Sequence, residues 1–359
     1  MRWLKARLHD LRRERGANAV LIALLFVPLM GAGAIAVDVG ALHAERAQLQ
    51  HGADAAALAI AKSCGASEAV CSVDGPGIAE SFVDGNAGTP VDGTATIDTI
   101  NYSQNFVRVS ASGEFPHLLA GFLFGGGAGT TTVSAGAASL WGSPIKGGTI
   151  PLAVAECELT RNFDPGTEET GDPFILMLIG PGNGAKNPEE CGPNYPGGFG
   201  WLEGDDIDGD GSPDCVVEVE VGVPEQGVPG SSDTKAGGCP DDYLADVIGQ
   251  TVLVPIYDSF TPDATGNHGS YNIARFAAFE VTGYHIASGS CQAPGQKTGN
   301  SCYLPGESNS PGFAGGEFGL QGYFVRYVEI GEDFELGDSG TPDGGLTVIR
   351  LLDYDDPIN

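Results

Sequence analysis

The stretch ANAVLIALLFVPLMGAGAIAV, residues 17–37, decides the fold because its 21 positions carry no ionisable side chain. At about 1.5 Å per residue, a helix of this length spans the roughly 30 Å hydrocarbon core of a bilayer. Six basic residues and two acidic ones precede it: Arg2, Lys5, Arg7, Arg12, Arg13 and Arg15 against Asp10 and Glu14. Because positively charged flanks stay in the cytoplasm, the pattern predicts a single-pass inner-membrane protein with a cytoplasmic N-terminus (1–16) and an extracytoplasmic body.

A cleaved secretory signal is the alternative interpretation. Such a signal has a shorter apolar core, of about 7–15 residues, followed by a small-x-small cleavage site. Residues 31–34 (GAGA) resemble such a site but lie inside the run. Residues 38–62 contain no proline and are rich in helix formers, with one apolar stripe formed by Leu42, Leu49, Ala53, Ala56 and Ile60. We therefore favour a retained anchor that continues outward as one long helix.

Two segments carry a family resemblance. The first joins RGANAV at residues 15–20 to AIAVDVGALHAERAQLQHGADAAALAIA at residues 34–61, and the second runs from FPH at 115–117 to TTTVSA at 130–135. They resemble the TadE/TadG-like Flp (tight adherence) pilus-assembly proteins, strongly over residues 12–140 and more loosely beyond. The resemblance implies a role in pilus assembly, with membrane-bound assembly proteins as partners of the N-terminal helix.

One position departs from the pilin-like members of this family. They place Glu five positions after the Gly of the processing site, where this chain has Leu21 after Gly16. Processing after Gly16 would leave a free amine in an apolar helix bundle without a carboxylate partner, which is costly. We therefore predict an uncleaved component that supports assembly without polymerising.

The composition bounds the partners and the domain count. A net charge of −30 opposes nucleic acid and anionic headgroups, so no nucleic-acid partner is expected. Hydrophobic residues make up 42% of the chain, enough for packed cores, and the length after the span favours two domains.

The first domain is predicted to be a pilin-like module over residues 38–141. Alternating residues at 94–100 and 106–112 predict a hairpin, and 130–140 predict a third strand. Glycine and proline at 142–148 then predict a linker.

The second domain, residues 149–332, is predicted to be mostly β, and 333–359 an acidic tail. Its candidate strands are 150–155, 174–179, 216–221, 251–257, 274–281 and 322–330. The fold class is therefore α+β: a long N-terminal helix with a small antiparallel sheet, followed by a disulfide-tied, mostly β domain.

Eight cysteines all follow the span: Cys64, Cys71, Cys157, Cys191, Cys215, Cys239, Cys291 and Cys302. None forms a C-x-x-C pair, which argues against zinc ribbons and thioredoxin-like sites. An even number outside the cytoplasm favours disulfides over buried free thiols. Loop length favours the pairs Cys64–Cys71 and Cys291–Cys302, and leaves Cys157–Cys191 and Cys215–Cys239 as sequential pairs.

An acidic run predicts a candidate calcium site with Asp206, Asp208, Asp210 and Asp214 as ligands. Its D-x-D-x-D-G pattern supplies carboxylates around a sharp turn at Gly211, as calcium-binding loops do. The twelfth position is Val217, however, where a full EF-hand has Glu. A solvated acidic turn is therefore the alternative.

Two further motifs imitate enzyme sites. Residues 180–186 (GPGNGAK) lack the Gly before and the Ser or Thr after Lys that a phosphate-binding loop needs. Residues 337–342 (GDSGTP) resemble the nucleophile segment of trypsin-like proteases, but no His or second Asp has the matching context for Ser339. We therefore expect no enzyme activity and no small-molecule substrate. The alternatives to pilus assembly are a calcium-stabilised surface adhesin and a secreted hydrolase.

Overall fold

The computed structural model describes two compact units of this chain. The described residues are 15–88, 91–117, 119, 129–157, 159, 174–179, 201–228, 238–239, 243–262, 269–285, 296–298, 301–303, 318–329, 334–338 and 346–355. Unit 1 comprises Met1–Ile100, Phe106–Ser139 and Leu351–Asn359, and unit 2 comprises Asn101–Asn105 and Leu140–Arg350.

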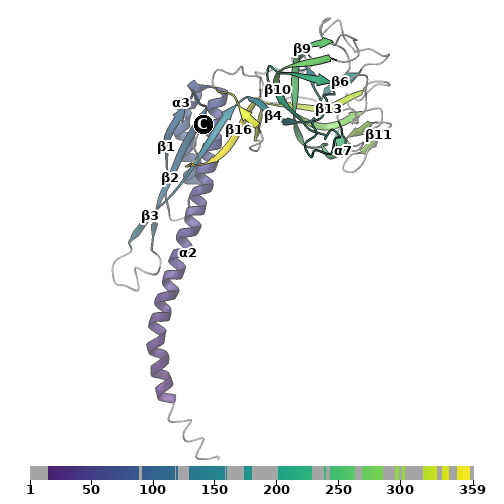
Figure 1. The fold of residues 1–359 in the computed structure, drawn as a ribbon. Coiled ribbons are helices and arrows are strands. Elements are labelled where there is room, and N and C mark those ends of the chain that lie inside the picture. The colour runs from purple at the N-terminus through teal and green to yellow at the C-terminus, as the bar shows by residue number, and fades with distance from the viewer. Residues whose placement is uncertain are drawn as a thin grey trace, which may run out of the picture. The chain divides into compact units, whose positions relative to one another are not determined.

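Unit 1 is built on α2 (Arg15–Ala66), a single helix of 52 residues. The N-terminal half of α2 stands clear, whereas the other elements of the unit lie along its C-terminal half (Figure 1). Leu49, Ala53, Ala56 and Ile60 of the predicted stripe are fully buried. The long helix and its packing face are therefore confirmed.

A second helix, α3 (Glu68–Asn86), returns along α2 and was not predicted. Its buried residues are spaced by four: Cys71, Gly75, Ala79 and Val83. Pro76 and the helix's glycines hid this pattern, because both residue types disfavour helix interiors. Tertiary packing against α2 overrides those local preferences.

The sheet of unit 1 has the strand order β1-β2-β3-β16. These strands are β1 (Gly93–Asn101), β2 (Phe106–Pro116), β3 (Thr130–Gly142) and β16 (Thr347–Asp353). The side chain of Asn101 shapes the turn between β1 and β2, because its Oδ1 accepts the N–H groups of Ser103 (3.0 Å) and Gln104 (3.1 Å). The predicted hairpin and third strand are confirmed.

Unit 2 is mostly β, as predicted, and its largest sheet centres on the long strand β10 (Gly269–His285). The path β11-β12-β10-β13-β6 is joined by β8 and β9, which pair with β10, and by β5, which pairs with β9. Their bounds are β5 (Val154–Ala155), β6 (Phe174–Ile179), β8 (Pro224–Gly227), β9 (Thr251–Pro262), β11 (Gln296–Thr298), β12 (Ser301–Tyr303) and β13 (Phe318–Val325). β9 and β13 are both antiparallel to β10, with Phe279 opposite Val252 on one side and Phe324 on the other.

A smaller sheet of unit 2 has the order β15-β4-β7. It consists of β15 (Phe334–Leu336), β4 (Pro144–Thr149) and β7 (Val217–Glu220). In addition, β14 (Tyr327–Glu329) pairs in parallel with the start of β16.

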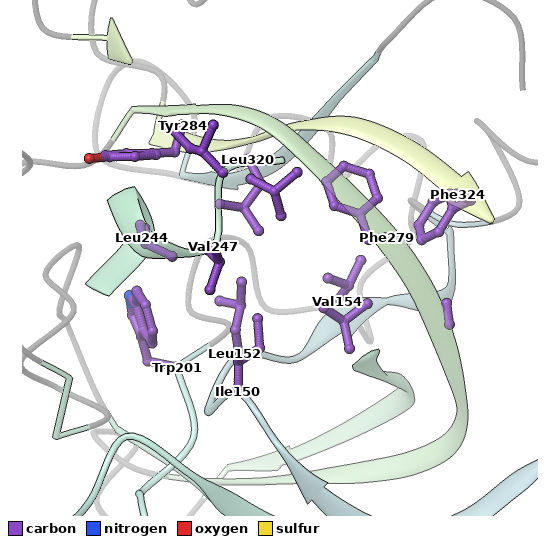
Figure 2. Packing of buried hydrophobic residues seen from close by; sticks show 14 of the residues in the cluster. Ile150, Leu152, Val154, Trp201, Leu244, Val247, Phe279, Tyr284, Leu320 and Phe324 are labelled. Atoms are coloured by element: carbon purple, nitrogen blue, oxygen red, sulfur yellow. The ribbon is translucent and has the colours of Figure 1, made fainter. Parts of the chain in front are cut away.

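The main core of unit 2 is an apolar cluster drawn from several of its elements (Figure 2). Ile150, Leu152 and Trp201 face Leu244 of the short helix α7 (Tyr243–Asp246). The rings of Phe279 and Phe324 meet edge to face with centroids 5.2 Å apart. Such burial supplies most of the stabilisation of a β-rich unit.

Two sequence expectations were wrong. The predicted linker at 142–148 is strand: β3 runs to Gly142 and β4 begins at Pro144. Gly147 is there for packing, since a Cβ atom on it would overlap the ring of Phe334. The predicted acidic tail contains β15 and β16, so these residues belong to the folded units.

Disulfides lie in both units. Cys64 and Cys71 join α2 to α3 with Cα atoms 4.7 Å apart, and Cys215 and Cys239 are bonded with Cα atoms 4.4 Å apart. The first pair was predicted from its short loop, and the second was predicted as a sequential pair. Cys157 is also disulfide-bonded. The other predicted pairings involve side chains outside the described set.

The close approach of α3 to α2 generates the first prediction. A Cβ atom on Gly52 would lie 3.0 Å from the Cα of Val83, whereas one on Gly77 of α3 would meet nothing within 4 Å. Gly77→Ala should stabilise the protein by roughly 0.5–1 kcal/mol, because alanine favours helix over glycine. Gly52→Ala should destabilise it, because the two backbones must separate. Thermal unfolding of the detergent-solubilised variants measures both, and a Gly52→Ala protein as stable as Gly77→Ala would contradict the packing.

Candidate functional site: the anchor helix and an acidic loop

The N-terminal half of α2 presents apolar side chains that are largely exposed. Val20, Leu24 and Val27 are 61%, 70% and 73% exposed. This helix is long and apolar enough to cross a membrane. A helix that is hydrophobic all round is stable when lipid surrounds it.

Burial begins at Ala34, just before the apolar run ends. Asp38 and Glu45 are only 3% and 4% exposed and lie seven residues apart, on the same face of α2 as Leu49. The Asp38 carboxylate accepts the backbone N–H of Leu119 (3.1 Å), and that of Glu45 accepts the N–H of Gly88 (3.2 Å). Both acids thus fix connecting segments of unit 1 to the helix. The seven-residue spacing was the signal for this role, and sequence reasoning missed it.

The acidic loop of unit 2 brings three predicted calcium ligands together. Carboxylate oxygens of Asp206, Asp208 and Asp210 lie within 4.8 Å of one another, and all three residues are exposed. The backbone turns tightly around them, with Gly209 and Gly211 at φ 77° and 87°. Only glycine adopts such angles without strain.

The oxygens of this loop also accept backbone hydrogen bonds. The two oxygens of Asp206 accept the N–H groups of Gly209 (2.8 Å) and Gly211 (2.9 Å). Oδ2 of Asp214 accepts the N–H of Ile207 (2.8 Å), and Asp214 is not part of the three-residue group. The loop is therefore preorganised by its own carboxylates.

The twelfth loop position points away from this cluster. Val217 is 1% exposed and belongs to an apolar core of unit 2. Its neighbour Glu218 donates its N–H to Oδ2 of Asp205 (2.6 Å). The EF-hand ligand at this position is therefore replaced by a core residue.

A second acidic group adjoins the loop and was not singled out from the sequence. The half-buried Glu225 on β8 has its pKa raised to about 7, chiefly by desolvation and further by the charges of Asp205 and Glu218. Its burial follows from pairing with Tyr271 across β8 and β10.

Neither of the two enzyme-like motifs forms a site among the described residues. Ser339 and residues 180–186 lie outside the described residues. Gly337, at the start of the protease-like segment, donates its N–H to the carbonyl of Ser143 (2.9 Å). That contact is an ordinary strand-end hydrogen bond.

The described residues comprise an N-terminal helix of membrane-spanning length and a mostly β body. Within that helix, residues 16–63 match the family model described as Putative Flp pilus-assembly TadE/G-like. The chain thus carries a TadE/G-like segment, which coincides with α2 and confirms the resemblance in its sequence. No curated protein matches this chain. No solved structure matches it either.

Glu225 generates the second prediction. The folded-state pKa of about 7 exceeds the ordinary value of 4.5, so the folded protein binds the extra proton. The neutral acid therefore contributes stability that is present below about pH 4.5 and is lost as the pH rises through 7. Glu225→Gln should remove this loss. Melting temperatures of parent and variant between pH 5 and pH 8 measure the difference.

Parallel melting curves across that pH range would contradict the raised pKa. Exposed Glu68 on α3 offers the control, because Glu68→Gln removes the same charge at an exposed position.

Proposed function

We propose that this chain is a non-enzymatic, single-pass membrane component that supports Tad/Flp-type pilus assembly or adherence. The observation that carries the proposal is the coincidence of the TadE/G-like segment with α2. The N-terminal half of that helix exposes apolar side chains suited to lipid, and its C-terminal half packs against the other elements of unit 1. The helix would contact assembly proteins in the membrane, and the body would make contacts in the envelope.

The orientation follows from charge. Six basic residues precede the span, and the whole chain carries −30. Cationic flanks are retained on the cytoplasmic side, so the N-terminus is cytoplasmic and the body lies outside the inner membrane.

The chain supports fibres without forming them. Gly16 begins the matched segment, but Leu21 stands where pilin-like members have Glu, and Asp38 is the first acidic residue after Gly16. A new amine after Gly16 would be buried in a filament without a charge partner. Unit 2 would also crowd a thin fibre.

The third prediction tests this function in cells that carry the gene. Deleting the gene should remove surface fibres, and restoring it should return them. Fibres sheared from wild-type cells should lack the chain, and N-terminal analysis of the membrane-bound protein should show residues before Gly16. A mature start at Ala17 with the chain recovered in fibres would overturn the proposal.

The same cells test the orientation. Protease added to intact spheroplasts should remove the body and leave the N-terminus protected. Protection of the whole chain would reverse the topology.

A calcium-stabilised surface adhesin is the second candidate function. It is favoured by the three carboxylates that converge in the loop at residues 206–210. A gene neighbourhood with a secretion ATPase and a prepilin peptidase would favour assembly over this alternative.

The fourth prediction concerns calcium. If the loop binds Ca²⁺, free calcium at 100 times its dissociation constant should stabilise the folded protein by about 2.7 kcal/mol. Replacing Asp208 and Asp210 by Asn should abolish the response, because it removes two charged ligands. Calorimetric melting with calcium and with chelator measures it.

Asp74→Asn with Asp84→Asn is the matched control, since these exposed residues of α3 carry the same charge away from the loop. If calcium does not change the melting curve of the parent protein, the loop is a solvated acidic turn and not a calcium site.

A further inference from the structure

Unit 2 contains an open, mostly apolar pocket between β4, β15, α7 and the start of β9. Its volume of about 370 Å³ lies near the lower end of the roughly 300–1,000 Å³ that ligand pockets span. A pocket of this size suits one large apolar side chain better than a whole cofactor. Its main lining residues are Ile150, Cys215, Val216, Tyr243, Leu253 and Phe334.

The pocket is formed by the fold and is left open by a glycine. Gly148 of β4 lines it, and a Cβ atom there would lie 3.3 Å from Cγ1 of Val216. Val216 keeps 37% of its surface exposed although it is apolar. The disulfide between Cys215 and Cys239 fixes the adjacent wall. A preformed apolar pocket lowers the entropic cost of binding.

The segment that supplies Val216 is strongly acidic. Residues 201–228 contain nine acidic residues and no basic one. The carbonyl of Val216 accepts the N–H of Asp205 (2.8 Å), which places the base of the acidic loop beside the pocket. Glu218 lies opposite Gly148 in the β4–β7 ladder, and its side chain is 65% exposed. Carboxylates therefore border the pocket.

Two cations near the pocket do not balance these charges. Nζ of Lys146 lies 3.3 Å from the carboxylate of Glu218 and 3.8 Å from that of Glu220. Nη1 of Arg350 donates to the carbonyl of Phe334 (3.3 Å). The surrounding surface therefore remains negative, and such a surface attracts cationic partners and repels anionic ones.

We propose that this pocket binds a basic segment of a partner protein, which inserts one large apolar side chain between the acidic residues. The apolar walls hold the inserted side chain as an anchor, and lysine or arginine on either side of it pairs with carboxylates such as that of Glu218. The charge selects this occupant, because an acidic segment would be repelled.

The inference rests on the proposed envelope contacts of the body, for which it supplies the chemistry of the partner. It can fail while the membrane anchor stands, because the pocket is lined by residues of unit 2 and α2 belongs to unit 1.

The test measures the binding of short, fluorescently labelled peptides to the full-length protein in a non-ionic detergent. The peptides are KKLKK, KKFKK and KKWKK, with KKAKK lacking the anchor side chain and EEFEE reversing the charge. A chelator is present throughout, so that calcium does not change the charge of the acidic loop. Fluorescence anisotropy gives each dissociation constant, with empty micelles as the background.

At least one of the three anchor peptides should bind. KKAKK should bind about tenfold more weakly than the best of them, because it leaves the pocket empty. EEFEE should not bind. Raising the salt concentration from about 50 mM to about 300 mM should weaken the binding, because the charges around the pocket are screened.

Two variants locate the site. Val216→Asn should weaken the best peptide about fivefold, because it makes the pocket polar, and Glu218→Gln should weaken it and reduce the salt dependence. The matched controls are Val73→Asn and Glu68→Gln at exposed positions of α3, which should change nothing. The melting temperature of each variant shows that it remains folded.

Equal binding of KKAKK and KKFKK, unaffected by Val216→Asn, would mean that the acidic surface merely collects cations, and would overturn the pocket as the site. Binding of EEFEE as tight as that of KKFKK would overturn the basic partner. If no peptide binds, the proposal fails, whereas the membrane anchor is judged separately by the protease test on spheroplasts.

Discussion

The structure depends on one continuous helix, α2, whose N-terminal half is exposed and apolar and whose C-terminal half packs against the rest of unit 1. Up to Val39, α2 keeps large apolar side chains exposed, as a helix of membrane-spanning length does. From Ala34 onward, one face of the same helix becomes buried, so the two regimes overlap by about one and a half turns. Asp38 lies in this overlap and joins them, because its carboxylate binds the hairpin end at the point where the span finishes.

Close packing in unit 1 follows from small residues on that buried face. Ala53, Ala56 and Ala57 are fully buried, and Gly52 brings α3 within van der Waals distance of the α2 backbone. Such contacts let the backbones of the two helices pack closely. The Cys64–Cys71 disulfide then restricts the turn between the helices in the unfolded chain.

The sequence predicted what depends on local periodicity. The span, the stripe through Leu49 and Ile60 and the first hairpin follow from spacing, and β6 follows from the apolar composition of a segment between turn-forming residues. The prediction from sequence failed where tertiary contacts override local preference. Pro76 lies inside helix α3, and Gly147 lies in a strand, where the ring of Phe334 fills the space that a side chain would need. Of the candidate site, the acidic pattern located three converging carboxylates, whereas the raised pKa of Glu225 depends on burial across β8 and β10 that no local pattern shows.

The chain order also constrains how unit 1 is completed. Unit 2 is inserted between β3 and β16, which are neighbours in one sheet. The last residues of unit 1 are integral to it: Tyr354 packs its ring against Gly136 and donates its hydroxyl to Asp98 (3.0 Å). The sheet beside α2 is therefore closed only after all of unit 2 has been synthesised. Because non-local pairing carries a loop-closure cost that grows slowly with length, an insertion of this size is tolerated. The main segment of unit 2, Leu140–Arg350, is consequently continuous in the chain with unit 1 at both of its ends.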